Sequence, residues 1–158
     1  MKIRVGFGYD VHPLEMGRPF YLGGIHIPHT SGATGHSDAD VLIHAICDAL
    51  LGAAALRDIG FHFPNTDEQY KGIDSKILLK LTQEKLNTEH WLLGNLDCTL
   101  CLEKPKIQDY IPQMQAVLSA ILNCDTDQIS IKATTNEKMG FIGREEGVCA
   151  YAVALIHS

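Results

Sequence analysis

Asp10, His12 and His44 are the residues whose types and spacing most clearly predict chemistry. Asp10 and His12 are two residues apart at the end of an apolar run, and His44 lies in a segment with helical spacing. Residues two apart on a strand project to the same face, so Asp10 and His12 can point toward one ion. Zinc accepts imidazole nitrogens and carboxylates, and three protein ligands leave a fourth position for substrate. The trio therefore predicts a catalytic metal site, provided that the helix of His44 packs against this strand.

Strands and helices alternate along the chain in a mixed order. Apolar alternation bounded by turn residues predicts strands at residues 2–9, 19–24, 92–102, 129–133 and 148–156. Apolar residues at helical spacing predict helices at residues 37–55, 74–86 and 108–122. We expect the first helix to open with a capping box of Ser37 and Asp40. The last strand is apolar on both faces, which predicts burial on both sides.

The fold class predicted from this order is an α/β (α+β) sandwich, formed by a single domain of residues 1–158. A mixed β-sheet is expected to be covered by helices on one face. Its other face is expected to meet another copy of the chain. The site would then lie where the first strand and the first long helix pack together.

The composition makes several functional classes improbable. The 158 residues are 46% apolar and carry a formal charge of −6, which disfavours nucleic acid and anionic membranes as partners. No apolar stretch approaches transmembrane length, and we see no secretory signal. The five cysteines, an odd number, predict reduced thiols, with Cys98 and Cys101 buried on opposite faces of a strand. We expect the bacterial cytoplasm, or a plastid-type organelle if a transit peptide has been removed.

Other polar motifs could serve the same site, but each also has an ordinary structural explanation. Residues 35–38 could hold an anion at a helix start or simply cap the helix. Residues 132–138 could meet a phosphate and, through Glu137, a second divalent cation, or form a polar turn. Arg144 could bind phosphate or pair with a neighbouring glutamate. Asp48, one turn after His44, could orient that imidazole or be a polar helix residue.

Taken in order, these motifs resemble the 2-C-methyl-D-erythritol 2,4-cyclodiphosphate synthase family. The likeness rests on Gly-Tyr-Asp-Val-His at residues 8–12, Gly-His-Ser-Asp-Ala-Asp-Val at 35–41, and Asp-Ala-Leu-Leu-Gly-Ala at 48–53. It continues through Asp-Ile-Gly at 58–60, Phe-Pro-Asn-Thr-Asp at 63–67, Lys-Ala-Thr-Thr-Asn-Glu at 132–137 and Gly-Arg-Glu-Glu-Gly at 143–147. The match covers essentially the whole chain without a large insertion. Tyr9, Asn65 and Glu145 depart from the family's usual Phe, Asp and Gly.

The resemblance implies a homotrimeric enzyme of the non-mevalonate isoprenoid pathway, with active sites between subunits. Its substrate would be 4-diphosphocytidyl-2-C-methyl-D-erythritol 2-phosphate, which cyclises to 2-C-methyl-D-erythritol 2,4-cyclodiphosphate and releases CMP. By this likeness Asp10, His12 and His44 hold one Zn²⁺ per subunit. Glu137 would help hold a Mg²⁺ or Mn²⁺ that bridges substrate phosphates. His36 and Thr135 would be the catalytic residues, stabilising the transition state.

The resemblance also implies two sets of substrate contacts. The erythritol phosphate would be met by Asp10, His12, His36, Ser37, Asp58, Ile59, Gly60, Phe63, Pro64, Asn65, Thr66 and Asp67. The cytidine diphosphate would be held by the adjoining subunit's copies of Leu102, Glu103, Lys104, Pro105, Lys106, Ile107, Gln108, Thr134, Thr135, Asn136 and Glu137. Phe141 and Arg144 would contact ligand as well. A metal-dependent nucleotide-diphosphate phosphohydrolase and a non-catalytic trimeric diphosphate-binding protein are the alternatives.

Overall fold

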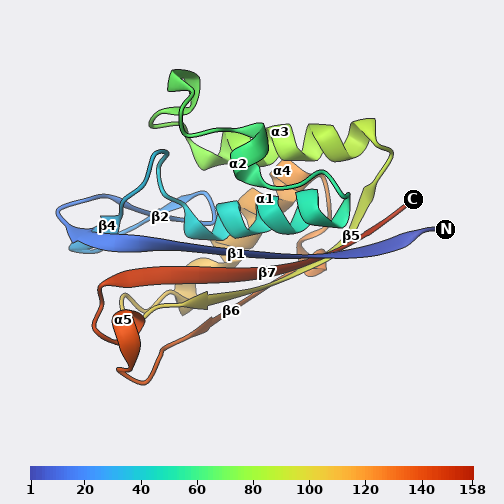
Figure 1. Cartoon of the computed structure of the whole chain (residues 1–158). Coiled ribbons are helices and arrows are strands. Elements are labelled where there is room, and N and C mark those ends of the chain that lie inside the picture. Colours follow the sequence, from blue (N-terminus) through green and yellow to red (C-terminus); the bar gives the residue numbers. More distant parts are fainter.

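The computed structural model describes all 158 residues (Figure 1). Its strands are β1 (Ile3–Met16), β2 (Phe20–Leu22), β3 (Ile25–Ile27), β4 (Ser31–Ala33), β5 (Leu92–Cys101), β6 (Ile129–Thr134) and β7 (Gly147–His157). Its α-helices are α1 (Val41–Ala53), α2 (Ile59–His62), α3 (Ser75–Thr88), α4 (Ile111–Leu122) and α5 (Gly140–Gly143). Three short 3-10 turns cover Glu68–Tyr70, Gln108–Tyr110 and Thr126–Gln128.

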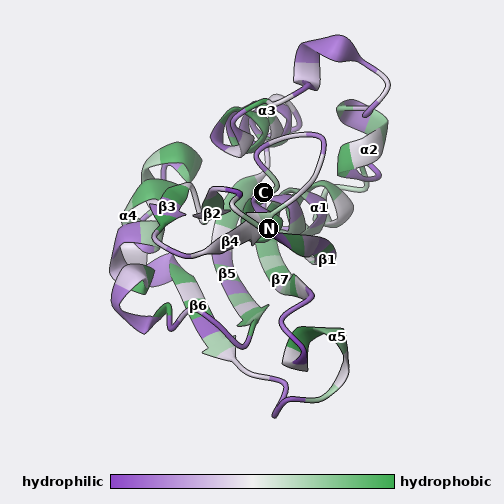
Figure 2. Cartoon of the chain, turned by 90° about the vertical axis from the view of Figure 1, so that its left-hand side faces the viewer, coloured by the Kyte–Doolittle hydropathy of each residue, from purple (hydrophilic) through white to green (hydrophobic).

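Five strands form one mixed sheet in the order β4-β1-β7-β5-β6, and β2 and β3 form a separate hairpin. Only the β5–β6 pair is parallel. Figure 2 shows β6, β5 and β7 side by side, with α1 and α3 above them and α4 beside β6. Helix α1 lies along β1 and β7. The predicted mixed α+β fold, with a mixed sheet and helices packed on it, is therefore confirmed.

Two glycines let β1 lie directly on the backbone of α1. A Cβ atom at Gly6 would come within 1.9 Å of the carbonyl oxygen of Ala49, and one at Gly8 equally close to that of Ala45. Ala45 and Ala49 are one helical turn apart and fully buried. Since side chains of a strand alternate between its faces, the next residues of β1 on this side also point toward α1. The two glycines thus bring Asp10 and His12, the predicted metal ligands on β1, against the helix that carries His44.

The first helix begins at Val41 and not at Ser37, so the predicted capping box is wrong. Its N-cap is Asp40, whose Oδ1 accepts a hydrogen bond from the Ile43 N–H at 3.0 Å. The two Asp40 oxygens also accept from the N–H groups of the turn that joins β2 and β3, Gly23 at 3.0 Å and Gly24 at 2.7 Å. This tertiary contact holds Asp40 at the helix start, and the preceding residues form a loop.

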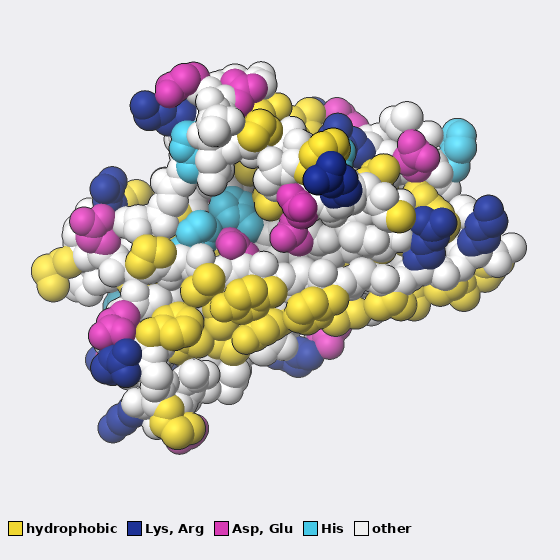
Figure 3. All heavy atoms as spheres, in the orientation of Figure 1, with side chains coloured by type: hydrophobic (Ala, Val, Ile, Leu, Met, Phe, Trp, Pro, Cys, Tyr) yellow, Lys and Arg dark blue, Asp and Glu magenta, His cyan; other side chains and the backbone are white.

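Most of the outer face of the sheet is uncovered. On β7, Ala152 and Ala154 are fully buried, but Tyr151 is 38% and Val153 40% exposed. The predicted burial of this strand on both sides is therefore wrong for most of its length in a single chain, because α5 covers Cys149 but no element of the chain covers Tyr151 and Val153. The residues of β1 that point the same way extend the exposed apolar surface along the strand (Figure 3). We call this surface the apolar stripe; it consists of Ile3, Val5, Phe7, Tyr9, Val11, Tyr151 and Val153.

The cysteines follow the prediction. All five are unpaired, and four of them are buried. Cys98 belongs to the main core, whereas Cys101 packs with Ile142 and Cys149 in a separate small cluster. The two thiols of the C-x-x-C therefore lie on opposite faces of β5. None of the helices is long and apolar enough to span a bilayer.

Candidate metal centre

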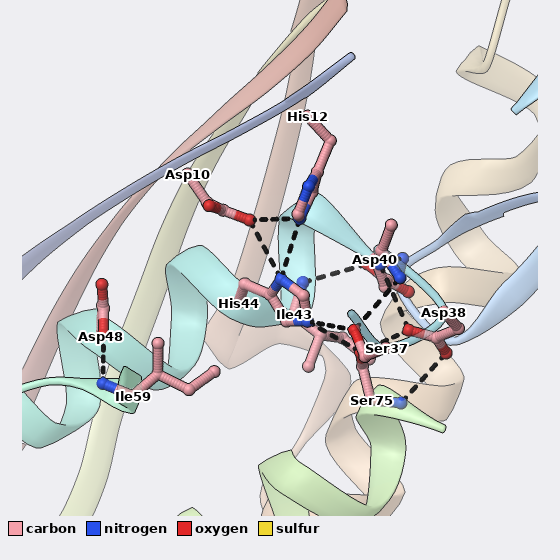
Figure 4. A network of polar contacts seen from close by, with 12 residues as sticks. Asp10, His12, Ser37, Asp38, Asp40, Ile43, His44, Asp48, Ile59 and Ser75 are labelled. Atoms are coloured by element: carbon pink, nitrogen blue, oxygen red, sulfur yellow. Dashed lines mark hydrogen bonds and ion pairs between the residues drawn. The ribbon is translucent and has the colours of Figure 1, made fainter. Parts of the chain in front are cut away.

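The structure brings Asp10, His12 and His44 together (Figure 4). Asp10 Oδ2 lies 2.9 Å from His12 Nε2 and 3.0 Å from His44 Nδ1. The two ring nitrogens lie 3.1 Å apart. Asp10 and His12 come from the α1-facing side of β1, and His44 comes from the first turn of α1. The predicted convergence of a strand pair and a helical imidazole is confirmed.

These distances fit a small tetrahedral cation. Ligand bonds of about 2.0–2.2 Å in a tetrahedral arrangement separate neighbouring ligand atoms by roughly 3.3 Å. The three measured separations are slightly shorter than that and nearly equal, so a small outward shift of each side chain would accommodate an ion. Two nitrogens and one carboxylate oxygen are also a donor set that such ions accept. The trio therefore fits a divalent metal held by three protein ligands.

In the metal trio, Asp10 and His44 each stabilise the charged form of the other. Burial alone would raise the pKa of Asp10, but hydrogen bonds from His12 and His44 outweigh it and lower that pKa to about 2. Burial alone would lower the pKa of His44, but the hydrogen bond and negative charge of Asp10 outweigh it and raise that pKa. Asp10 is thus a carboxylate at neutral pH. A bound cation would take the place of the protons shared among these groups.

The second ring nitrogen of His44 does not contact Asp48. Asp48 Oδ1 accepts a hydrogen bond from the Ile59 N–H at 2.7 Å and so supports the start of α2. His44 Nε2 instead lies 2.9 Å from Ser75 Oγ and 3.1 Å from Ser37 Oγ. Of the two roles considered for Asp48, the structure supports a structural one, because its carboxylate lies one turn along α1 and bonds to the first residue of α2 (Figure 4).

A cavity of about 170 Å³ adjoins the metal ligands. It gathers most of the residues predicted for the erythritol phosphate, namely Asp10, His12, His36, Ser37, Ile59, Gly60, Phe63 and Asn65. Pro64, Thr66 and Asp67 lie outside its lining, and Asp58 caps α2 by accepting from the Phe61 N–H at 2.9 Å. We refer to this space as the metal cavity.

Four residues that were not predicted as substrate contacts also line the metal cavity, namely Asp48, Tyr70, Ile73 and Leu78. Asp48 shares a helix face with His44, and that spacing could have identified it. The other three are apolar or aromatic residues of a later segment, and nothing in their local pattern distinguishes them from core residues. His36 offers a further clue, because its Nε2 atom is buried without a hydrogen-bond partner. A buried polar atom of this kind is suited to meet a ligand.

The residues predicted for the cytidine diphosphate line a different cavity, of about 160 Å³, which we call the second cavity. Its lining comprises Leu102, Glu103, Pro105, Lys106, Ile107, Gln108, Ala133, Thr134 and Thr135. Lys104 lies outside the lining and pairs with Glu145 at 3.0 Å. Glu103 Oε1 accepts from the Asn136 N–H at 2.9 Å, which ties the loops after β5 and β6 together. The two cavities have no residue in common.

Glu137, Phe141 and Arg144 line neither cavity. Glu137 is exposed, and its nearest side-chain partner is the hydroxyl of Thr135, at 3.4 Å. Phe141 is 39% exposed. Arg144 donates two hydrogen bonds to Glu146, at 3.0 and 2.9 Å, so the ion pair considered for it from the sequence is present. Within one chain, the structure does not bring these residues to the metal ligands.

Comparison with known proteins identifies the class to which this fold and site belong. The family model described as the YgbB family matches residues 3–157, so the chain belongs to this family. A relative from Cytophaga hutchinsonii named 2-C-methyl-D-erythritol 2,4-cyclodiphosphate synthase is 61% identical over 156 residues, which cover 99% of this chain and 98% of the relative. The resemblance predicted from the motifs is therefore confirmed.

Solved structures show the same fold. The bifunctional IspDF from Campylobacter jejuni matches 98% of this chain with a TM-score of 0.94 and 41% identity, and the chain spans 42% of that longer protein. A 2C-methyl-D-erythritol-2,4-cyclodiphosphate synthase in a CDP-bound form matches 98% of this chain and 100% of its own length. That pair has a TM-score of 0.90 and 36% identity.

Proposed function

We propose that the chain is a zinc-dependent synthase that cyclises 4-diphosphocytidyl-2-C-methyl-D-erythritol 2-phosphate to 2-C-methyl-D-erythritol 2,4-cyclodiphosphate and releases CMP. The observation that carries the proposal is the convergence of Asp10, His12 and His44 beside a cavity in which His36, Ser37 and Asn65 can donate hydrogen bonds to a phosphate. The synthase names of relatives at 61% and 60% identity support the same reaction. This reaction is a step of the non-mevalonate isoprenoid pathway.

The site would work mainly by positioning and charge. The 2-phosphate must attack the β-phosphorus of an already anionic diphosphate. Zn²⁺ held by Asp10, His12 and His44, together with Mg²⁺ or Mn²⁺ held by Glu137, would supply positive charge to the phosphate oxygens. His36, with its unpartnered Nε2, would donate a hydrogen bond to the phosphate that gains charge. Thr135 would stabilise the same transition state from the other side.

This reaction requires little acid–base catalysis. The attacking phosphate is already ionised, and CMP leaves as a weak base, so no strong general base is needed. Holding both reacting groups in one site makes the attack effectively unimolecular. The residues of the metal cavity would hold the erythritol phosphate for this purpose, and those of the second cavity would hold the cytidine diphosphate.

A complete active site then requires two copies of the chain. Because the two cavities share no residue, we infer that the metal cavity of one subunit faces the second cavity of its neighbour in a homotrimer. Copies of the chain would associate through the apolar stripe, because its large apolar side chains are exposed to solvent. Val5 and Phe7 are 63% and 62% exposed. Phe141 and Arg144 would reach ligand from this side of the molecule. We place the enzyme in the bacterial cytoplasm, as a single domain of residues 1–158.

The test is a product assay with the purified protein. After removal of metal by a chelator, the substrate should remain unchanged, and added Zn²⁺ with Mg²⁺ should restore cyclic diphosphate and CMP, followed by phosphorus NMR. His44→Ala should give no cyclic product under any of these conditions. A linear, hydrolysed diphosphate would indicate a phosphohydrolase instead, and binding of substrate without turnover would indicate a binding protein. Either result would overturn the proposal.

A further inference from the structure

The two ring nitrogens of His44 have different surroundings. Nδ1 faces Asp10 and His12 in the metal trio, at 3.0 and 3.1 Å. Nε2 points the opposite way, toward the hydroxyls of Ser75 and Ser37 (Figure 4). Only a nitrogen without a proton can bind a metal, so the tautomer of this ring decides whether the trio functions.

The contacts around Ser75 fix the direction of each hydrogen bond. The carboxylate of Asp38 can only accept, and its Oδ1 is in very close contact with Ser75 Oγ. Ser75 therefore donates its single hydroxyl proton to Asp38. A lone pair of Ser75 Oγ then remains to accept a proton from His44 Nε2, 2.9 Å away. The chain of bonds runs from His44 through Ser75 to Asp38, and it keeps a proton on Nε2. Nδ1 can then bind a cation that takes the place of the proton it shares with Asp10.

This arrangement is rigid. Ser75 is fully buried, so no bulk water can replace its hydroxyl, and its N–H donates to Asp38 Oδ2 at 3.0 Å. Asp38 is itself held by its own N–H, which donates to the Ile73 carbonyl at 3.1 Å, and by the Asp40 N–H, which donates to its Oδ1 at 3.2 Å. The same loop accepts a further bond of 2.7 Å from the Gly72 N–H to the His36 carbonyl.

Ser75 is not needed to start α3. The N-cap of that helix is Asp74, whose Oδ1 accepts from the Lys76 N–H at 2.9 Å. Asp74 adjoins Ser75 in the chain but makes no contact with His44. The helix start and the orientation of His44 therefore depend on two different side chains, and this separation allows a matched control.

Resting on the metal site of the proposed function, we propose that Asp38 and Ser75 are positioning residues that hold His44 in its metal-binding tautomer. They also link the metal site to the segment before α3, because Asp38 bonds to Ile73, and Tyr70 and Ile73 line the metal cavity. Metal affinity and the docking of this segment are then coupled, and by linkage each stabilises the other.

The test compares zinc affinity, measured by competition with a chromogenic chelator, in Ser75→Ala, Asp38→Asn, the double variant and the control Asp74→Ala. Loss of a group that orients a metal-bound histidine typically weakens metal binding about 10- to 100-fold, and we expect this for both single variants. The double variant should bind zinc as tightly as the single variant with the lower zinc affinity, because the two residues act as one unit. Asp74→Ala should retain wild-type affinity although α3 loses its cap.

Two further measurements separate orientation from general damage. Urea unfolding of the metal-free variants should show Asp74→Ala and Ser75→Ala destabilised by comparable amounts, although only Ser75→Ala binds zinc more weakly. In the Co²⁺-substituted protein, Ser75→Ala should change the visible absorption bands, which report the ligand geometry. Zinc affinity of Ser75→Ala within about twofold of wild type would overturn the inference, as would independent, multiplying effects in the double variant. Failure of the wild type to bind zinc would instead overturn the proposed function.

Discussion

The metal cavity and the second cavity differ in how far a single chain completes them. The metal ligands are partly or largely buried, with Asp10 26% and His44 12% exposed, and each already contacts the others. We call the second cavity and the adjoining turn of residues 135–138 the second region. There Glu137 is exposed, and Thr135 is its only side-chain partner. One region is organised before any ligand or partner arrives. The other has its backbone tied by Glu103 but leaves the Glu137 side chain with a single long contact.

The difference follows from the elements that carry each region. The metal ligands lie on β1 and α1, where Gly6 and Gly8 allow the strand to touch the helix backbone. The second region consists of turns after β5 and β6, in which Glu137 and Lys138 adopt positive φ angles of 52° and 62°. Rigid elements hold functional groups more accurately than turns do. Under the proposed function, substrate and a neighbouring subunit would supply further contacts to the second region.

The largest expected effect is loss of a metal ligand. His44→Ala should lower kcat by at least about a thousandfold, because positive charge at the reacting phosphate contributes several kcal/mol and each 1.36 kcal/mol is tenfold in rate. Zinc content measured by atomic absorption should fall in parallel, from about one per chain. Cyclase turnover that survives in zinc-free His44→Ala would contradict the role assigned to the metal cavity.

A change in the second region should lower activity without removing zinc. Glu137→Gln should reduce kcat roughly a hundredfold, the scale of losing one group that stabilises transition-state charge. Zinc content should stay at the wild-type level, since Glu137 contacts none of the three ligands. Added Mn²⁺ should restore part of the activity if the loss is in affinity for the second ion. Loss of zinc in this variant would show that the two regions are not separate.

The metal-free protein should show the charge coupling of the trio in its pH dependence. The pKa of Asp10 falls from 3.8 to about 2 on folding, so its ionised form stabilises the fold above pH 4, by about 2 kcal/mol at most, and this is lost as pH falls toward 2. The pKa of His44 is raised above 6.5, so its protonated form stabilises the fold below that value and the contribution is lost as pH rises through the raised pKa.

Urea unfolding of chelator-treated protein tests this window. The free energy of unfolding of wild type should exceed that of Asp10→Asn most between about pH 4 and pH 6.5, and the difference should shrink on either side. Glu137→Gln is the matched control from the second region, because its exposed carboxylate contacts only Thr135. A difference between wild type and Asp10→Asn that does not change with pH would contradict the coupling.

The metal trio could be predicted because its signals are local. Asp10 and His12 share a strand face, and His44 lies in a helix whose apolar spacing is clear. The start of α1 could not be predicted in this way. The local sequence fits a capping box of Ser37 and Asp40 as well as it fits an N-cap at Asp40. What decides the matter is the contact of Asp40 with the N–H groups of Gly23 and Gly24, which is formed only in the folded chain.

The groups that orient His44 were also beyond the reach of the sequence pattern. Asp48 had the right helical spacing, but Ser75 reaches the ring from a helix 31 residues away. Nothing in the local sequence of α3 distinguishes Ser75 from an ordinary first-turn residue. Likewise, the outer face of β7 was expected to be buried from its composition, and only the fold shows that the chain itself leaves most of that face open. Long-range pairing, not local propensity, determines these features.

The smallest effect, and the sharpest test of the comparison, comes from mixing two strongly impaired variants. His44→Ala lacks a metal ligand but keeps the second region intact. Glu137→Gln keeps all three metal ligands but is defective in the second region. If each active site combines two subunits, trimers reassembled from equal amounts of the two chains should contain intact sites at about one quarter of the interfaces, and activity should recover to about that fraction of wild type. The control is a mixture of His44→Ala with the His44→Ala/Glu137→Gln double variant, which can form no intact site. If both regions act within one chain, the first mixture should show no more than the residual activity of its Glu137→Gln chains, because no subunit then carries both functional halves.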